Sequence, residues 1–138
     1  MMHRLAIRVY YEDTDFGGVV YYANYLKFLE RGRTEALRDL GVDQVALKQA
    51  GTVFVVRRVE ADYVKPARFD DILEVRTRAE TIRKASVVMA QEIFRGDDLL
   101  LTAIITVACM GENGRPVRIP PEISANLVQL EQSVPDGP

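Results

Sequence analysis

The residues most able to do chemistry are concentrated between positions 11 and 25. Two carboxylates, Asp13 and Asp15, stand two positions apart and are followed closely by Gly17 and Gly18. A glycine-rich loop that enters a helix leaves main-chain N–H groups without partners, and such groups can polarise a carbonyl or hold an oxyanion. Asp15 could then attack that carbonyl or activate water. The same residues also suit an ordinary turn, in which Asp13 braces the loop and the glycines supply positive φ.

The rest of the composition narrows the chemistry that this loop could support. The chain of 138 residues contains one histidine, His3, and one cysteine, Cys109. A Ser-His-Asp triad, a Cys-His pair or a zinc site would depend on these residues, and His3 precedes the first expected strand. We therefore expect chemistry that uses carboxylates, hydroxyls, cations or main-chain amides, with no cofactor and no metal.

The charge balance and the hydropathy argue against two classes of partner, although they leave a local basic patch open. Lys and Arg number 18 against 20 Asp and Glu, which gives a formal net charge of −2 and no broad basic surface for nucleic acid. Apolar runs fall far short of the roughly 20 residues of a membrane helix, and the N-terminus has no apolar signal region. A single cysteine fits a reducing compartment. We expect a cytoplasmic protein that neither binds nucleic acid nor inserts into a membrane.

One long helix and five strands are expected to hold the loop in place. Residues 4–10 alternate between apolar and polar side chains, as in a half-buried strand. Leucines at helical spacing, from Leu26 to Leu40, predict a helix that starts at Asn24 as its N-cap. Gly32 lies in the middle of this helix, where glycine lowers helix stability by about 1 kcal/mol relative to alanine. Close approach by another backbone or a ligand would explain the glycine, and so would simple tolerance of the cost. Similar patterns predict short helices over 43–50 and from Pro120, and strands over 52–64, 72–82, 86–95 and 99–110.

These elements predict an α+β fold of one domain over residues 1–132, with a frayed tail at 133–138. Four consecutive strands joined by short turns form an antiparallel sheet. The strand over 99–110 is apolar on both faces, so we expect it to be central and covered on both sides. The long helix can cover only one face of the sheet. The remaining face and the edge strands therefore favour a homodimer.

The loop and its surroundings resemble the hot-dog acyl-CoA thioesterases, and the similarity extends over nearly the whole chain. The nearest subgroups are the 4-hydroxybenzoyl-CoA thioesterases and the bacterial thioesterases associated with the Tol-Pal system. In the loop, the resemblance rests on Asp13-Thr14-Asp15, Gly17-Gly18-Val19-Val20-Tyr21 and Asn24-Tyr25. Three further stretches are similar to the second subgroup: residues 28–35, 54–57 and 64–71.

This resemblance implies a fold, a reaction and two catalytic positions. The hot-dog fold is a curved five-stranded antiparallel sheet wrapped around a long central helix, and it dimerises. The implied reaction is hydrolysis of acyl-CoA, with Asp15 as nucleophile or general base and the main-chain N–H of Tyr22 polarising the thioester carbonyl. Asp13, Gly17 and Gly18 would support the loop. The Tol-Pal-associated subgroup usually has histidine at the Tyr22 position, whereas the aroyl-CoA subgroup has tyrosine, so the preferred acyl group stays open.

Binding of CoA requires cations for its phosphates, and two turns offer them. Arg83, Lys84 and Ser86 lie in or beside a turn between two strands, where side chains and amides can reach a phosphate. In the family, the matching turn contributes to nucleotide binding. Arg115 and Arg118, which follow Gly114 in the turn after the last strand, form a second candidate. Each of these residues also suits an ordinary solvated surface.

One other function stays open from the sequence, and a second is disfavoured. The domain could bind acyl-CoA or an acyl carrier protein without turning it over, since a fold does not fix a function. A hydratase on the same fold uses an aspartate with a histidine, and no suitable histidine is present here. The expected assembly is a homodimer, and the family also offers a tetramer.

Overall fold

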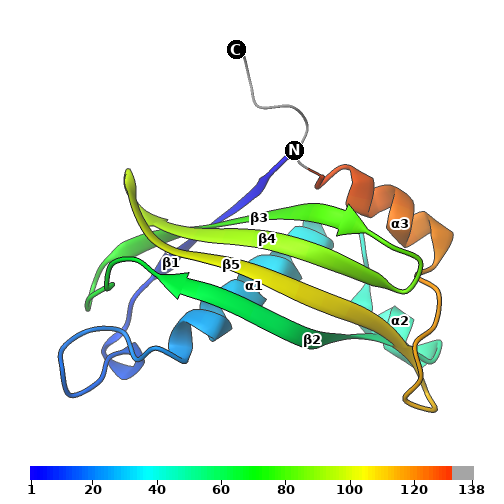
Figure 1. The fold of residues 1–138 in the computed structure, drawn as a ribbon, viewed down its shortest axis with the longest axis horizontal. Coiled ribbons are helices and arrows are strands. Elements are labelled where there is room, and N and C mark those ends of the chain that lie inside the picture. The colour runs from blue at the N-terminus through cyan, green and yellow to red at the C-terminus, as the bar shows by residue number, and fades with distance from the viewer. Residues whose placement is uncertain (132–138) are drawn as a thin grey trace.

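A five-stranded antiparallel sheet curves over one long helix, α1, in the computed structural model, which describes residues 1–131 (Figure 1). The strands are β1 (His3–Arg8), β2 (Thr52–Tyr63), β3 (Ile72–Ile82), β4 (Ser86–Arg95) and β5 (Asp98–Gly111). The helices are α1 (Asn24–Asp39), α2 (Gln44–Gln49) and α3 (Pro121–Val128), with a 3₁₀ turn, η1, at Tyr11–Asp13. None of the helices in these residues has the length and hydropathy that crossing a membrane requires. The predicted α+β class is confirmed, while the tail expected at 133–138 lies outside the described residues.

The strand order places β2 at one edge of the sheet. The order is β1-β3-β4-β5-β2, so the chain crosses the sheet between β2 and β3. β2 pairs with β5 along its whole length, from Thr52 opposite Gly111 to Tyr63 opposite Leu101. Its other side has no partner strand among the described residues. The central strand is β4, whereas β5, which we expected at the centre, lies between β4 and β2.

The hydrophobic core lies between α1 and the face of the sheet that curves toward it. The buried residues of α1 recur at helical spacing and form one stripe: Tyr25, Phe28, Leu29, Gly32 and Ala36. β3 buries every second side chain from Leu73 to Ala79, as its sequence pattern predicted. Leu26, which we expected on the buried face, is exposed instead, because it lies beside this stripe rather than in it.

Gly32 allows α1 to pack closely against the sheet. A Cβ atom added at this position would lie 2.6 Å from Val75 Cγ1 and 3.1 Å from Thr77 Oγ1. Because Cβ atoms essentially never make a contact of 2.6 Å, any side chain here would push the helix and β3 apart. Close approach to side chains of the sheet therefore explains the mid-helix glycine.

The start of α1 differs from the prediction. The helix is preceded by Ala23, whose side chain offers no cap. Asn24, predicted as the N-cap, is the first helical residue, and its amide nitrogen donates a 2.9 Å hydrogen bond to the main-chain oxygen of Asp13. The asparagine thus joins the helix to the preceding loop. It does not accept a hydrogen bond from the free N–H groups of the first helical turn, as an N-cap would.

The outer face of the sheet, opposite α1, is only partly covered. On β5, the side chains of Thr102 and Ile104 are half-buried on this face, whereas Thr106 and Ala108 are buried, so the strand is buried on both faces over only part of its length. The apolar character of its outer face reflects β-branched and small side chains that suit a pleated sheet. No second layer of the described chain packs against them.

Candidate active site

The residues between Thr14 and Val20 form a tight loop closed by main-chain hydrogen bonds. The N–H of Asp15 donates to the oxygen of Val19 at 2.9 Å, and the N–H of Gly18 donates to the oxygen of Asp15 at 3.0 Å. Gly18 has a φ of 79°, a conformation that residues with a side chain rarely adopt. Glycine therefore allows the chain to reverse directly after Asp15.

The carboxylate of Asp15 is exposed and is held at only one of its oxygens. The N–H of Gly17 donates a 2.9 Å hydrogen bond to Asp15 Oδ1. A Cβ atom at Gly17 would lie 3.3 Å from the same oxygen, so glycine leaves room for this contact. Asp15 Oδ2 accepts no hydrogen bond from residues 1–131. One oxygen is thus oriented, while the other is free to act on a substrate or on water.

The main-chain N–H of Tyr22 also has no hydrogen-bond acceptor among residues 1–131. Tyr22 lies two positions before the first residue of α1, and no acceptor within the described residues receives its N–H. The neighbouring N–H of Tyr21 is occupied, because it donates to the oxygen of Asp13 at 2.9 Å. A free N–H near a helix N-terminus, where the helix dipole is positive, suits a negative charge that develops on an oxygen.

Asp13 is buried beside the loop, and its side chain and main chain form hydrogen bonds with the residues on either side of it in the sequence. Its carboxylate oxygen Oδ2 accepts the N–H of Tyr10 at 2.8 Å. Its main-chain oxygen accepts the N–H of Tyr21 and the amide of Asn24. These contacts fit the bracing role expected from the sequence.

A strap of residues 64–71 supports the loop and the start of α1. The N–H of Val20 donates to the oxygen of Ala67 at 2.8 Å. The N–H of Ala67 in turn donates to the hydroxyl oxygen of Tyr25 at 2.9 Å. Burial raises the pKa of Tyr25, so this hydroxyl stays protonated at neutral pH. The strap, the loop and the helix are therefore joined at one point.

Asp71 fixes the end of this strap to β4. The N–H of Arg68 and the guanidinium of Arg95 both donate to Asp71 Oδ2, at 2.9 and 2.8 Å. Arg95 also donates to the main-chain oxygen of Pro66 at 3.2 Å. Although partial burial opposes ionisation, these bonds hold the pKa of Asp71 below its usual value. The carboxylate is therefore ionised at neutral pH and anchors the strap as an ion pair.

An apolar depression of about 280 Å³ lies beside the loop. Tyr22, Tyr25 and Tyr63 form part of its wall. The rings of Tyr25 and Tyr63 meet edge to face, with centroids 5.3 Å apart. Asp15 is not part of this wall. Asp15 and Tyr22 therefore belong to one loop, but in a single chain this depression is lined by Tyr22 and not by Asp15.

The predicted phosphate-binding turns lie together at the end of the sheet remote from the loop (Figure 1). The residue after Arg118 donates its N–H to the main-chain oxygen of Lys84 at 2.7 Å, which brings the two turns side by side. Arg83, Lys84 and Arg118 are exposed, whereas Ser86 is buried. In one chain, the length of β3, 11 residues or about 35 Å, separates these cations from Asp15.

Two contacts near the site are not marked by any sequence pattern. The side chain of Tyr63 is 47% exposed, and its hydroxyl donates to the main-chain oxygen of Tyr22 at 2.8 Å. Arg33, on α1, donates to the buried Gln91 of β4. The partners in these bonds are 41 and 58 positions apart, so no local spacing could have found them.

Known proteins resemble this chain over most of its length. Residues 9–127 match the family model of the thioesterase-like superfamily. The acyl-CoA thioester hydrolase YbgC of Escherichia coli O6:H1 is 42% identical over 130 residues, which cover 93% of this chain and 97% of that protein. The acyl-CoA thioesterase YbgC of Haemophilus influenzae is 42% identical over 127 residues, which cover 91% of this chain and 93% of that protein.

Solved structures show the same likeness. The structure described as "Probable Thioesterase from Bartonella henselae" is 41% identical, with a TM-score of 0.84, and the match covers 87% of this chain and 100% of that one. The fold, the loop before α1 and the matched family model all point to one assignment. The chain belongs to the thioesterase-like superfamily and has the hot-dog fold that the sequence predicted.

Proposed function

We propose that this chain hydrolyses acyl-CoA thioesters, with Asp15 as the catalytic carboxylate and the N–H of Tyr22 as the donor to the thioester carbonyl oxygen. One observation carries the proposal. A single loop combines an exposed carboxylate that has a free oxygen with an unpaired N–H at the start of a helix. The names of the 42% identical relatives support the same reaction and the same class of substrate.

Two routes use these groups and give the same products. In the first, Asp15 Oδ2 attacks the thioester carbon, the C–S bond breaks and CoA leaves as a thiolate; water then hydrolyses the mixed anhydride and restores the carboxylate. In the second, Asp15 accepts a proton from a water molecule as that water attacks the same carbon, and the departing sulfur receives the proton. In both routes the carbonyl oxygen gains negative charge, which the N–H of Tyr22 and the dipole of α1 stabilise.

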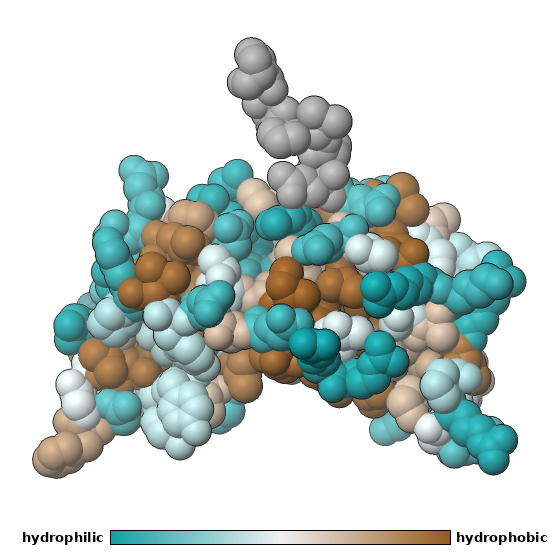
Figure 2. Space-filling model, viewed as in Figure 1, coloured by the Kyte–Doolittle hydropathy of each residue, from teal (hydrophilic) through white to brown (hydrophobic). Residues whose placement is uncertain are grey.

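We propose further that the chain acts as a homodimer joined through β2. The unpaired edge of β2 carries exposed apolar side chains at Val55, Val56 and Val59. The surface is hollowed along this edge, which lies at the bottom of Figure 2. A strand that pairs with its own copy across a two-fold axis runs antiparallel to it. Such pairing would protect the edge and continue the sheet through both subunits.

This dimer would bring the separated parts of the site together. The loop lies at the Tyr63 end of β2, where Tyr63 contacts Tyr22. The predicted phosphate-binding turn lies at the other end, since Ser86 is opposite Ala108 in the sheet and Ala108 is opposite Val55. Antiparallel pairing places one end of β2 beside the opposite end of its copy. The cations of one subunit would then stand near the catalytic loop of the other.

Release of CoA from a panel of thioesters tests the proposed reaction. The panel contains acetyl-, butyryl-, hexanoyl-, palmitoyl- and 4-hydroxybenzoyl-CoA, and loss of thioester absorbance avoids a thiol reagent that could label Cys109. We expect Asp15→Asn to lower kcat at least about 100-fold while circular dichroism stays unchanged. The matched control is Glu12→Gln, because Glu12 is an exposed carboxylate three positions away and has no role in the proposal.

Three results would contradict the proposal. Undiminished turnover in Asp15→Asn would remove Asp15 from the mechanism. Binding of acyl-CoA by the wild type without release of CoA would favour a non-catalytic binding module, and release of acid from acyl carrier protein thioesters alone would change the substrate.

A further inference from the structure

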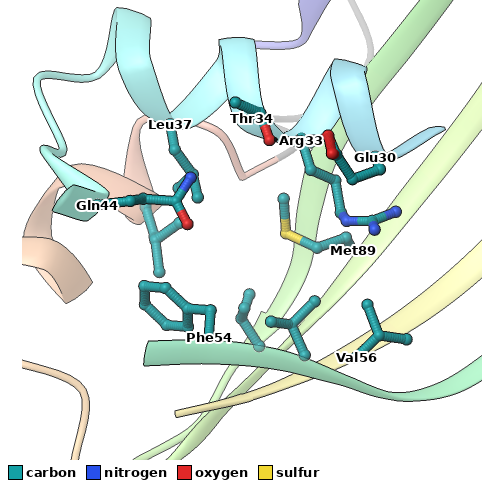
Figure 3. Close-up of a pocket in the computed structure, with 11 residues that line it drawn as sticks. Glu30, Arg33, Thr34, Leu37, Gln44, Phe54, Val56 and Met89 are labelled. Carbon is teal, nitrogen blue, oxygen red and sulfur yellow. Dashed lines mark hydrogen bonds between the residues drawn. The ribbon is translucent and has the colours of Figure 1, made fainter. Parts of the chain in front are cut away.

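The groups proposed to react lie outside the apolar cavity beside the second half of α1. This cavity, of about 150 Å³, is bounded by α1 and by strands of the sheet, and Figure 3 shows the side chains around it. Leu37, Phe54 and Met89 form part of its wall, and no residue of the loop or of the entry to α1 does. In a single chain, the relative position of Asp15 and Tyr22 is therefore set by the hydrogen bonds around the entry of α1.

The main-chain oxygen of Asp13 joins the loop to the entry of α1. It accepts two hydrogen bonds, from the N–H of Tyr21 and from the side-chain amide of Asn24, both at 2.9 Å. Asp13 stands two positions before Asp15, and Tyr21 stands directly before Tyr22. One carbonyl oxygen thus links the segment that carries the proposed carboxylate to the segment that carries the proposed N–H donor.

A tight turn over Tyr21–Asn24 leaves the N–H of Tyr22 free. The N–H of Asn24 donates to the main-chain oxygen of Tyr21 at 2.8 Å, so Tyr22 and Ala23 occupy the two central positions of a four-residue turn. The hydrogen bond of such a turn uses the N–H of its last residue and not that of its first central residue. The direction of the proposed donor is therefore a property of this turn.

Asn24 both closes this turn and anchors it. Its N–H closes the turn on Tyr21, while its side-chain amide fastens the turn to Asp13. The side chain is half-buried and makes no other hydrogen bond within residues 1–131. The first turn of α1 does not use this side chain, because no side chain caps the helix start. The amide of Asn24 therefore serves the loop and not the helix.

We propose that Asn24 is a positioning residue for hydrolysis of the thioester and acts through the main-chain oxygen of Asp13. This inference rests on the proposed hydrolysis of acyl-CoA. The reacting atoms have to approach to about 3–3.5 Å at Asp15 while the thioester oxygen meets the N–H of Tyr22. Loss of the Asn24 amide frees the turn from the loop. A small displacement between the two groups then lowers the rate of the reaction more than it weakens binding.

Replacement of Asn24 tests this role through the separate effects on kcat and KM. Asn24→Ala removes the amide, and we expect kcat for the fastest thioester of the panel to fall about 10- to 100-fold, with KM changed less than about three-fold. Asn24→Ser also lacks the amide but suits the start of a helix, so it should lose as much kcat and keep the wild-type melting temperature. Asn24→Gln keeps an amide donor on a longer side chain and should recover part of kcat.

Asn126→Ala is the matched control for these variants. Asn126 is also a half-buried asparagine of a helix, but it lies on α3. The end of α3 contacts β3 at Ala79, remote from the strap that joins β3 to the loop. Its kcat and KM should equal those of the wild type. A loss of kcat as large as that of Asn24→Ala would show that turnover responds to any such helix change, and it would overturn the inference.

Hydrogen exchange at the amide of Tyr21 tests the anchor without a substrate. This N–H shares its acceptor with the side chain of Asn24, so in Asn24→Ala it should exchange at least about five-fold faster than in the wild type. The N–H of Val20, which donates to the oxygen of Ala67, is the internal control and should exchange as before. Equal exchange at Tyr21 in the two proteins would overturn the inference.

The outcomes separate this inference from the proposed reaction. Wild-type kcat in folded Asn24→Ala or Asn24→Ser, beside an active wild type, would overturn the inference and leave the thioesterase proposal intact. A higher KM with unchanged kcat would assign Asn24 to binding and would also overturn it. If the wild type hydrolyses no thioester, the thioesterase proposal fails, and the exchange of the Tyr21 amide then decides whether Asn24 anchors the turn.

Discussion

The hydroxyl of Tyr63 donates a 2.8 Å hydrogen bond to the main-chain oxygen of Tyr22. Tyr63 is the last residue of β2, and Tyr22 stands just before α1. The bond therefore ties the free edge of the sheet to the entry of the helix. It also restrains the residue whose N–H is the proposed donor to the thioester carbonyl.

Removal of this hydroxyl should weaken catalysis more than stability. Tyr63→Phe keeps the aromatic ring and loses one hydrogen bond of about 1 kcal/mol, so we expect kcat to fall about three- to ten-fold. The melting temperature should fall by no more than about 5 °C. Steady-state hydrolysis of butyryl-CoA measures the effect, and Tyr10→Phe, at another exposed tyrosine, is the control. Wild-type kcat in Tyr63→Phe would show that Tyr22 keeps its orientation without the bond.

The elements of this fold could be predicted because their patterns are local. Apolar and polar side chains alternate along β3, and apolar side chains recur at helical spacing in α1. Each pattern arises because one face of the element packs against a single neighbouring layer. The loop could also be recognised, since Asp15, Gly17 and Gly18 lie in one continuous segment. No sequence rule links residues whose side chains meet only after the sheet has formed.

The contacts around the candidate site join residues that are distant in the sequence, so no local pattern predicts them. In the sequence, Arg33 is one of several charged residues on the polar face of a predicted helix. Gln91 is one polar residue within a predicted strand. Only the packing of α1 across the sheet brings them into a 3.0 Å hydrogen bond. The position of the predicted phosphate-binding turns illustrates the same point, because the sequence could not show that β3 separates them from Asp15.

Gly32→Ala should destabilise the protein even though alanine is the better helix former. The new Cβ atom would lie 2.6 Å from Val75 Cγ1. Overpacking costs about 1–3 kcal/mol, which exceeds the gain in helix propensity of about 1 kcal/mol. We expect the free energy of unfolding, measured by urea denaturation, to fall by up to about 2 kcal/mol. Lys27→Ala, at an exposed position of α1, should change it by less than about 0.5 kcal/mol. An increase in Gly32→Ala would mean that β3 moves to make room.

A charge on the free edge of β2 should separate the proposed dimer. Val59 is 42% exposed on this edge, and lysine at sheet edges opposes strand pairing. Sedimentation should show a dimer for the wild type and a monomer for Val59→Lys, with loss of turnover in the monomer. Ile72→Lys introduces the same charge at an exposed residue of β3 and should stay dimeric. An active wild-type monomer would contradict the interface through β2.

Asp71 should make part of the stability dependent on pH. Although partial burial opposes its ionisation, hydrogen bonds from Arg68 and Arg95 hold its pKa below the usual 3.8. A carboxyl with a lower pKa in the folded state stabilises the fold above its unfolded pKa, and that contribution is lost as the pH falls through the folded pKa. At neutral pH we expect Asp71→Asn to reduce the free energy of unfolding by about 1 kcal/mol.

Urea denaturation tests the direction of this pH dependence. The free energies of unfolding of the wild type and Asp71→Asn are compared at neutral pH and at about pH 3. The difference between them should shrink at the lower pH, because protonated Asp71 no longer forms an ion pair with Arg95. A difference that stays constant would assign the effect to neutral contacts such as the N–H of Arg68. Asp70→Asn is the control, since the ion pair of Asp70 with Arg8 is more exposed. Because Asp71 anchors the strap that supports the loop, only Asp71→Asn should also lower kcat at neutral pH.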